Sequence, residues 1–314
     1  MITPLVPPIL RKSSNIAPSV LIVDSTDPIV GPMDTGRDAA LPGRDAVPRD
    51  AAVTGPMSKK LVYIKSIQGG AIRTLFEVLK EIVHDVNLQF DSSGVKLLTM
   101  DGARCALVYL KLRADAFEDF SCIGRHNVGV NMGSVFKLVR TCGSHDTITL
   151  YIDADNTNEL GITISNHDKN SMTDFKLKLL DVDSEDINIP DVEFDSIVTM
   201  PSAYFQRICR DMLNISEKMT IRSQGDQLWL SCNGDFARQE TVVGPSDAGM
   251  SLSSVSEKRI EGTFSLKYLS LFCKASSLAN TMELFLKESY PIIIKYNVAS
   301  LGEIRFCLAP QIDD

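Results

Sequence analysis

The sequence lacks the motifs that mark the common classes of enzyme active site. It contains no G-x-x-x-x-G-K-[ST] phosphate loop, no G-x-G-x-x-G turn, no H-E-x-x-H zinc motif and no G-x-S-x-G nucleophile turn. Its four histidines stand mostly in or beside predicted polar turns, where an exposed imidazole is the ordinary case. We therefore expect a protein that is not an enzyme and that uses no cofactor or metal ion.

Patterned cysteine and long apolar runs are also missing. The seven cysteines are odd in number and scattered, and no two form a C-x-x-C pair. This argues against a zinc site or a disulfide framework, and for a cytosolic or nuclear compartment. No apolar run approaches the roughly 20 residues that a membrane-spanning helix needs. We expect no membrane partner.

Positive charge is outnumbered, since 32 Lys and Arg face 40 Asp and Glu and the net charge is −8. Taken alone, this balance disfavours a nucleic-acid partner. Many acids, however, gather in the stretch 180–195, which holds seven of them and no Lys or Arg. Its middle carries a small apolar island of Ile187, Ile189 and Pro190. Because Pro190 and the acid density disfavour a helix or a central strand, we interpret 180–195 as an extended connector over a surface.

The first 58 residues differ from the rest of the chain. Nine of the 14 prolines lie there, together with a degenerate Gly-Arg-Asp-Ala repeat, and there are no aromatic residues. Such a segment buries too little apolar surface to offset its chain entropy, so we expect disorder. The remaining chain divides into a first domain at 59–179, the connecting loop at 180–195 and a second domain at 196–314.

The chain on each side of the connector follows the same order of strand, helix, hairpin, strands, short helix and strands. Apolar residues at helical spacing predict helices at 71–83 and 134–141 in the first half, and at 203–213 and 266–275 in the second. Strands follow one another at hairpin spacing, which favours antiparallel pairing. The sequence therefore predicts an α+β fold built from one duplicated unit.

Each predicted helix carries two basic residues on its exposed side. The pairs are Arg73 with Lys80, Lys137 with Arg140, Arg207 with Arg210, and Lys267 with Lys274. We take Arg73 and Arg207 as equivalent in the two halves, and likewise Lys137 and Lys274. One such pair is usually a solvated helix face, but four suggest a single basic surface. Lys and Arg on helix faces meet phosphates as point charges and select no base sequence.

Several runs, taken together, resemble one family. They are Ser92-Ser93-Gly94-Val95, Gly129-Val130-Asn131-Met132, Leu177-Lys178-Leu179-Leu180-Asp181-Val182-Asp183, Met200-Pro201-Ser202, Arg207-Ile208-Cys209-Arg210-Asp211 and Leu308-Ala309-Pro310-Gln311-Ile312. From about residue 60 to the end, the chain resembles proliferating cell nuclear antigen, the sliding clamp of DNA replication. The Pro-rich extension is foreign to that family.

The resemblance implies a ring of three identical chains around duplex DNA, with helices lining the hole and sheets outside. Neighbours would join by edge strands, at about 173–178 in one chain and 238–243 in the next. The basic helix pairs and Arg125, which falls in the family's DNA-binding region at 121–140, would then hold DNA of any sequence.

The resemblance also implies a pocket beneath the connector that binds a short motif of polymerases, the clamp loader and other partners. By position the pocket residues are Met100, Arg104, Ile187, Ile189, Pro190, Pro291, Ala309, Pro310 and Gln311. Plain core packing is the alternative explanation for the apolar ones. Arg104 stands where relatives have His, and Cys307 where they have an aromatic residue, so the preferred motif is expected to differ. The turn at 223–226 lacks the lysine that eukaryotic relatives use for ubiquitin attachment.

The implied role is a non-enzymatic processivity factor of replication and repair, including mismatch repair and translesion synthesis. Its implied location is the nucleus, or a viral replication site if a virus encodes it. Two alternatives stay open: a subunit of a heterotrimeric checkpoint clamp, which shares the fold, and a monomeric protein–protein adaptor that uses only the pocket.

Overall fold

The computed structural model describes residues 59–183, 187, 192–247, 249–254 and 258–311. The predicted extension and the centre of the predicted connector lie outside the described residues. Within the described part, two halves contain the same elements in the same order. The first half holds β1 (Lys60–Ser66), α1 (Gly69–Ile82), β2 (Asp85–Asp91), β3 (Gly94–Met100), β4 (Ala106–Arg113), β5 (Asp119–Cys122), β6 (His126–Asn131), α2 (Met132–Val139), β7 (Thr147–Asp153), β8 (Asn156–Asn166) and β9 (Ser171–Lys178).

The second half repeats this order. It holds β10 (Ser196–Pro201), α3 (Ser202–Leu213), β11 (Lys218–Gln224), β12 (Gln227–Asn233), β13 (Arg238–Val243), β14 (Ser251–Ser254), β15 (Ile260–Ser265), α4 (Leu266–Phe272), the 3-10 helix η3 (Cys273–Ser277), β16 (Thr281–Leu286), β17 (Ile292–Val298) and β18 (Gly302–Leu308). A 3-10 turn, η2 (Ala114–Ala116), follows β4.

The strand pairings are duplicated as well. The order β5-β1-β7-β8-β9 in the first half has its counterpart in β14-β10-β16-β17-β18 in the second. The order β4-β3-β2-β6 has its counterpart in β13-β12-β11-β15. Neighbouring strands in these sheets are antiparallel. The α+β fold with a duplicated unit, expected from the sequence, is confirmed.

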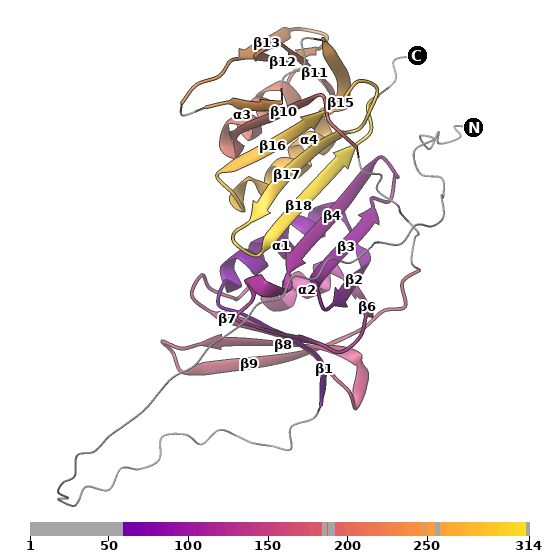
Figure 1. Ribbon diagram of the computed structural model, residues 1–314, viewed down its shortest axis with the longest axis vertical. Helices are drawn as coiled ribbons and strands as arrows, with labels where there is room; N and C mark the ends of the chain where they lie inside the picture. The colour runs from indigo at the N-terminus through magenta and orange to yellow at the C-terminus, as the bar shows by residue number, and fades with distance from the viewer. Residues whose placement is uncertain (1–58, 184–186, 188–191, 248, 255–257, 312–314) are drawn as a thin grey trace, which may run out of the picture. The chain divides into compact units, whose positions relative to one another are not determined.

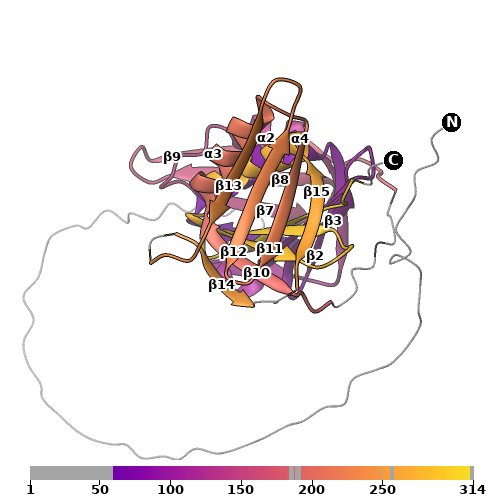
Figure 2. The same ribbon diagram turned by 90° about the horizontal axis from the view of Figure 1, so that it is seen from above.

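One strand pair joins the two halves. β4 pairs with β18, with Val108 opposite Phe306 and Leu110 opposite Ile304, and this fuses two of the sheets into one of nine strands (Figure 1). The counterparts of β18 and β4 are β9 and β13, and both are edge strands of their own sheets (Figure 2). Their outer backbone groups therefore have no strand partner among the described residues.

The four α-helices lie next to one another in a row. α1 contacts α2 and α4, and α4 contacts α3, so the order is α2, α1, α4, α3. Each buries an apolar stripe against the sheets; on α1 the stripe includes Ile72, Leu75 and Leu79. α2 begins where the Asn131 carboxamide oxygen accepts a hydrogen bond from the Ser134 backbone nitrogen at 2.9 Å. None of the helices in the described ranges has the length and apolar character needed to cross a bilayer.

The buried positions correct two of the equivalences taken from the sequence. Ile72 and Leu79 of α1 match Phe205 and Met212 of α3 at a spacing of 133 residues, so Arg207 is one position out of register with Arg73. On α2 and α4 the spacing is 134, as Val135 and Leu269 show. The counterpart of Lys274 is therefore Arg140 rather than Lys137.

The structure also differs from the expected elements in detail. α4 ends at Phe272 and continues as the 3-10 helix η3, so Lys274 lies on η3 rather than on a regular helix. The aromatic ring of Phe272 stacks on that of Phe306 at a centroid distance of 4.7 Å, which fixes this end of α4 against β18. Strands β5 and β14 were not predicted from the sequence pattern, because both are only four residues long.

Candidate nucleic-acid interface and partner cleft

The row of helices presents most of the predicted basic residues. Six of them are exposed, and in the described part of the chain only Lys274 among them has an ion pair. The six are Lys137, Arg140, Arg207, Arg210, Lys267 and Lys274. Arg73 and Lys80 on α1 are half-buried. The polar side of the helix row is therefore a surface on which cations from all four helices gather.

The α1 part of this surface also carries acids. Glu77 and Glu81 lie four residues apart and are both exposed. The Lys274 Nζ is 2.6 Å from Glu81 Oε2, and Lys80 Nζ contacts Oε1 of the same carboxylate. Hydrogen bonds from Lys274 and Lys80 lower the pKa of Glu81 to about 2, so the carboxylate is ionised near neutral pH.

Two other predicted cations are placed differently from the rest. Arg125 lies between β5 and β6 rather than on a helix; its side chain is largely exposed and 3.9 Å from Asp91 Oδ2. Arg73 buries its Nε, which has no hydrogen-bond partner among the described residues. The structure thus brings the helix cations together and does not add Arg125 to their row.

Aromatic rings support two of the helix cations. The guanidinium carbon of Arg207 is 5.2 Å from the ring centroid of Tyr204, one turn earlier on α3. Lys80 Nζ is 4.8 Å from the centroid of Phe136 on α2. These contacts orient long side chains without neutralising them. Arg207 has no ion pair among the described residues, whereas Lys80 also contacts the Glu81 carboxylate.

A cleft of about 650 Å³ lies beside the start of the predicted connector. It is lined by residues of β2 and β3, by Met100 and Arg104, and by residues 180–183. Leu180 is held at its edge, because its backbone nitrogen donates to the Gly129 carbonyl oxygen at 2.8 Å. Asn87 Nδ2 donates to the Val182 carbonyl oxygen at 2.8 Å. The connector therefore leaves β9 along one wall of this cleft.

Asp101 organises the turn that carries Arg104. Its Oδ1 accepts hydrogen bonds from the backbone nitrogens of Cys105 and Ala106, at 2.8 and 2.7 Å. Its Oδ2 accepts from the Tyr268 hydroxyl of α4 at 2.5 Å. Arg104 adopts a positive φ of 56°, a conformation that this network must hold in place. Burial, followed by the bond to Asp101, raises the pKa of Tyr268 well above its ordinary value.

The remaining predicted pocket residues meet the cleft only in part. Ala309 lies beside the Arg104 turn, since its backbone nitrogen donates to the Cys105 carbonyl oxygen at 3.2 Å. Gln311 is held by a backbone hydrogen bond of 2.7 Å to the Thr263 carbonyl oxygen. Pro291, Ala309, Pro310 and Gln311 do not line the 650 Å³ cleft. Ile187 is half-buried, and Ile189 and Pro190 lie outside the described residues.

Cys307, which we expected to alter the preferred partner motif, lies on β18 between Ile293 of β17 and Leu107 of β4. Burial raises the pKa of its thiol to about 12, so it stays protonated at neutral pH. A protonated thiol at this position behaves as a small apolar group.

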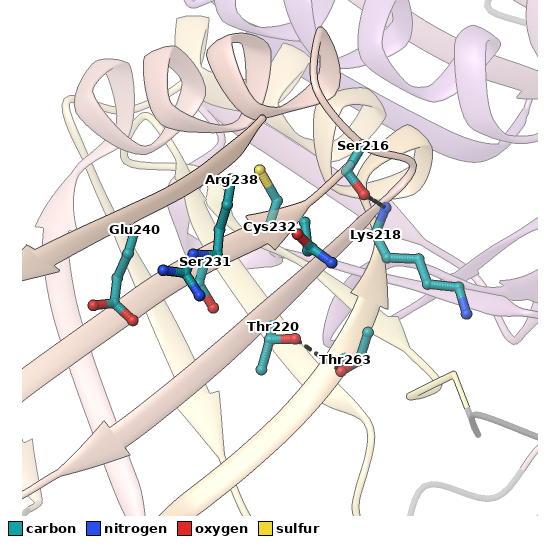
Figure 3. Close-up of a pocket in the computed structure, with 9 residues that line it drawn as sticks. Ser216, Lys218, Thr220, Ser231, Cys232, Arg238, Glu240 and Thr263 are labelled. Atoms are coloured by element: carbon teal, nitrogen blue, oxygen red, sulfur yellow. Dashed lines mark hydrogen bonds between the residues drawn. The ribbon is translucent and has the colours of Figure 1, made fainter. Parts of the chain in front are cut away.

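A second depression, of about 610 Å³, was not identified from the sequence. It lies on the face of the β13-β12-β11-β15 sheet and is lined by Lys218, Arg238, Glu240 and several hydroxyl groups (Figure 3). The Thr220 and Thr263 hydroxyls are 3.0 Å apart across two strands. The lining is mostly polar, and no cluster able to hold a metal ion occurs among the described residues. Arg238 and Glu240 place it next to the free edge of β13.

Comparison with known proteins places both halves in one family. Residues 62–186 match the model of the proliferating cell nuclear antigen N-terminal domain, and residues 188–311 match that of the C-terminal domain. A relative from Paramecium bursaria Chlorella virus 1, described as "Probable DNA polymerase sliding clamp 1", is 44% identical over 254 residues. The match covers 80% of this chain and 97% of that protein. The chain therefore belongs to the proliferating cell nuclear antigen family of DNA sliding clamps.

Proposed function

We propose that three copies of this chain close into a ring that encircles duplex DNA and tethers DNA polymerase to it. The observation that supports the ring most directly is the duplicated topology. β18 pairs with β4 inside the chain, while their counterparts β9 and β13 are both edge strands. Pairing β9 of one copy with β13 of the next would repeat the internal junction between copies. This contact is heterologous, and in a closed ring every β9 and every β13 would have a strand partner.

The internal junction also supplies the register. Through the hairpin pairings, Phe175 of β9 corresponds to Phe306 of β18, and Gln239 of β13 corresponds to Val108 of β4. Since Phe306 faces Val108, we expect Phe175 to face Gln239 of the next copy. In the same register Thr173 faces Thr241.

Exposed apolar side chains at these two edges support the contact. Met172 on β9 is 74% exposed, and Phe236, two residues before β13, is 77% exposed. Val242 on β13 is also exposed. Large apolar groups gathered on complementary edges are typical of surfaces that become buried on assembly.

Engineered cysteines test the ring and its register together. Thr173→Cys combined with Thr241→Cys places two thiols at directly opposed positions, within disulfide range. We expect oxidation to give covalent trimers on denaturing gels, whereas Thr173→Cys with Gln239→Cys, a slip of two residues, should link poorly. A strict monomer by native mass spectrometry at micromolar concentration would refute the ring.

The helix row is proposed as the inner wall of the ring. Cations from all four helices would contact phosphates without reading bases, so the ring would hold the duplex and still slide. We expect a variant with four of these cations neutralised to leave circular DNA sooner than the wild type, with its assembly unchanged. The four substitutions are Lys137→Gln, Arg140→Gln, Arg207→Gln and Arg210→Gln. Unchanged retention, with polymerase stimulation intact, would show that another face meets the DNA.

The cleft beside 180–183 and Arg104 is proposed as part of the docking site for the motif of polymerases, a clamp loader and repair proteins. We also propose domain boundaries at 59–179 and 196–314. The protein would act at a nuclear or viral replication site, and it would take part in mismatch repair and translesion synthesis. A chain that forms trimers by itself would favour the homotrimer over a subunit of a heterotrimeric checkpoint clamp. Retention on DNA that falls as salt rises would favour it over a monomeric adaptor, which would bind DNA without salt dependence or not at all.

A further inference from the structure

Glu81 lies where the helices of the two halves meet. Its carboxylate contacts the ammonium groups of Lys80 on α1 and Lys274 on η3, the latter at 2.6 Å. Both lysines belong to the set of candidate phosphate-binding cations. One carboxylate thus cancels half of the positive charge that the two lysines bring to this part of the helix row.

We propose that Glu81 is a positioning residue that weakens the hold of the clamp on DNA by keeping Lys80 and Lys274 engaged. The inference rests on the proposed function, because it requires the helix row to face DNA. A phosphate that approaches either lysine must compete with a carboxylate already in contact. A ring that slides needs many weak contacts rather than a few strong ones, and Glu81 lowers the strength of contact where the two halves join.

Comparison of the two halves shows what this acid changes. Arg140 at the end of α2 is the counterpart of Lys274, and it is exposed with no ion pair in the described part of the chain. The counterpart of Glu81 on the second half is Asn214, which is uncharged and donates its Nδ2 hydrogen bond to the Arg210 carbonyl oxygen. Of the two equivalent cations in each chain, Lys274 therefore has an acidic partner and Arg140 has none among the described residues.

Glu81→Gln removes the charge and keeps the shape of the side chain. We expect it to tighten binding to a nicked circular duplex about 3- to 10-fold at moderate salt, and to steepen the dependence of log K on log salt by about one to two. Glu77→Gln is the matched control, because Glu77 is exposed on the same helix one turn earlier and has no ion pair with the described residues. Its effect should stay below about 2-fold. Equal effects of both variants would overturn the proposal, since net charge alone would then explain them.

A second comparison measures the same two substitutions with and without Glu81. If the carboxylate engages Lys274, Lys274→Gln should weaken DNA binding less than Arg140→Gln does while Glu81 is present. In the Glu81→Gln background the two losses of affinity should become equal. Equal losses in the wild-type background would refute the proposal. The part of this comparison made in the wild-type background still decides the matter if Glu81→Gln disturbs assembly, which native mass spectrometry and melting temperature would reveal.

The failure of this inference can be told apart from failure of the proposed function. Lys137→Gln with Arg140→Gln should weaken DNA binding whether or not Glu81 has this role. If that double variant weakens binding while Glu81→Gln behaves like Glu77→Gln, the helix row faces DNA and only the role of Glu81 is wrong. If none of these variants changes DNA binding, the helix row does not face DNA and both proposals fall.

Discussion

At the scale of single residues, a close contact on the sheet surface joins Gly161 and the Tyr151 ring. These residues pair directly across β8 and β7, and a Cβ atom on Gly161 would come within 2.3 Å of the Tyr151 ring. The ring lies between Lys60 and Lys176, whose Nζ atoms are 3.9 and 4.1 Å from its centroid. The missing side chain is therefore what allows Tyr151 to lie flat across β8.

We expect Gly161→Ala to destabilise the protein by about 1–3 kcal/mol, because the ring must leave both lysines to make room. Chemical denaturation would measure the loss. Gly102→Ala is the control, since a Cβ at Gly102 would meet nothing within 4 Å and its φ is not in the left-handed region. An equal loss for both variants would show that contact with the Tyr151 ring does not decide the cost.

The Glu81 pair also gives a prediction about acid. The pKa of the Glu81 carboxyl is lowered from 4.5 to about 2, so the ion pair stabilises the fold above about pH 4.5. This stabilisation is lost as the pH falls towards 2. The wild type should therefore lose its advantage over Glu81→Gln across that window. The side chain is a third exposed, so we expect a difference of less than about 1 kcal/mol, measured by thermal melts at each pH. A constant difference across the window would show that the ion pair adds no stability.

At the scale of elements, the sequence predicted the helices well and their ends less well. Apolar residues at helical spacing located all four helices of the described part, because each buries one continuous stripe. The same spacing could not show that α4 ends at Phe272, since a 3-10 turn keeps Ala275 and Cys273 buried as well. The short strands β5 and β14 lack the length that an alternating pattern needs.

A hydrogen bond connects the helix row to the cleft beside residues 180–183 and Arg104. Tyr268 of α4 donates to Asp101, which in turn holds the Arg104 turn through backbone hydrogen bonds. No sequence pattern could pair these residues, because they are 167 positions apart and on different halves. The sequence indicated Arg104 only through resemblance to the family.

We expect Tyr268→Phe to lower stability by about 0.5–1.5 kcal/mol, and to weaken binding of a clamp-binding peptide several-fold by loosening the turn. Isothermal titration with such a peptide would measure the second effect. Tyr290→Phe is the matched control: its ring packs against Phe194, and no hydrogen bond of its hydroxyl occurs among the described residues. Equal peptide affinity for wild type and Tyr268→Phe would show that the hydrogen bond to Asp101 does not affect peptide binding.

At the scale of the whole molecule, the duplication was visible in the sequence but its consequence was not. Element order alone showed two similar halves, whereas the free edges appear only once strand pairing is known. β13 shows why, since its exposed and half-buried residues alternate with no fully buried position, and no core pattern marks it. The sequence showed the basic residues of the helices, but it did not show that Glu81 of one half pairs with Lys274 of the other.

The exposed edge of β13 gives the last prediction, which concerns assembly. Phe236 is 77% exposed in the single chain, so its replacement should not disturb folding, yet in the proposed register it would face Lys178 of the next copy. We expect Phe236→Ser to weaken each contact between copies by about 1–3 kcal/mol through lost apolar burial, so that the ring dissociates at higher protein concentrations. Serine is used because an acid would form an ion pair with Lys178 and mask the loss. Ile67→Ser, which removes an apolar side chain that is 56% exposed outside both edges, should leave assembly unchanged. Sedimentation velocity over a dilution series would compare the three proteins, and a wild-type profile for Phe236→Ser would show that the copies do not meet at this end of β13.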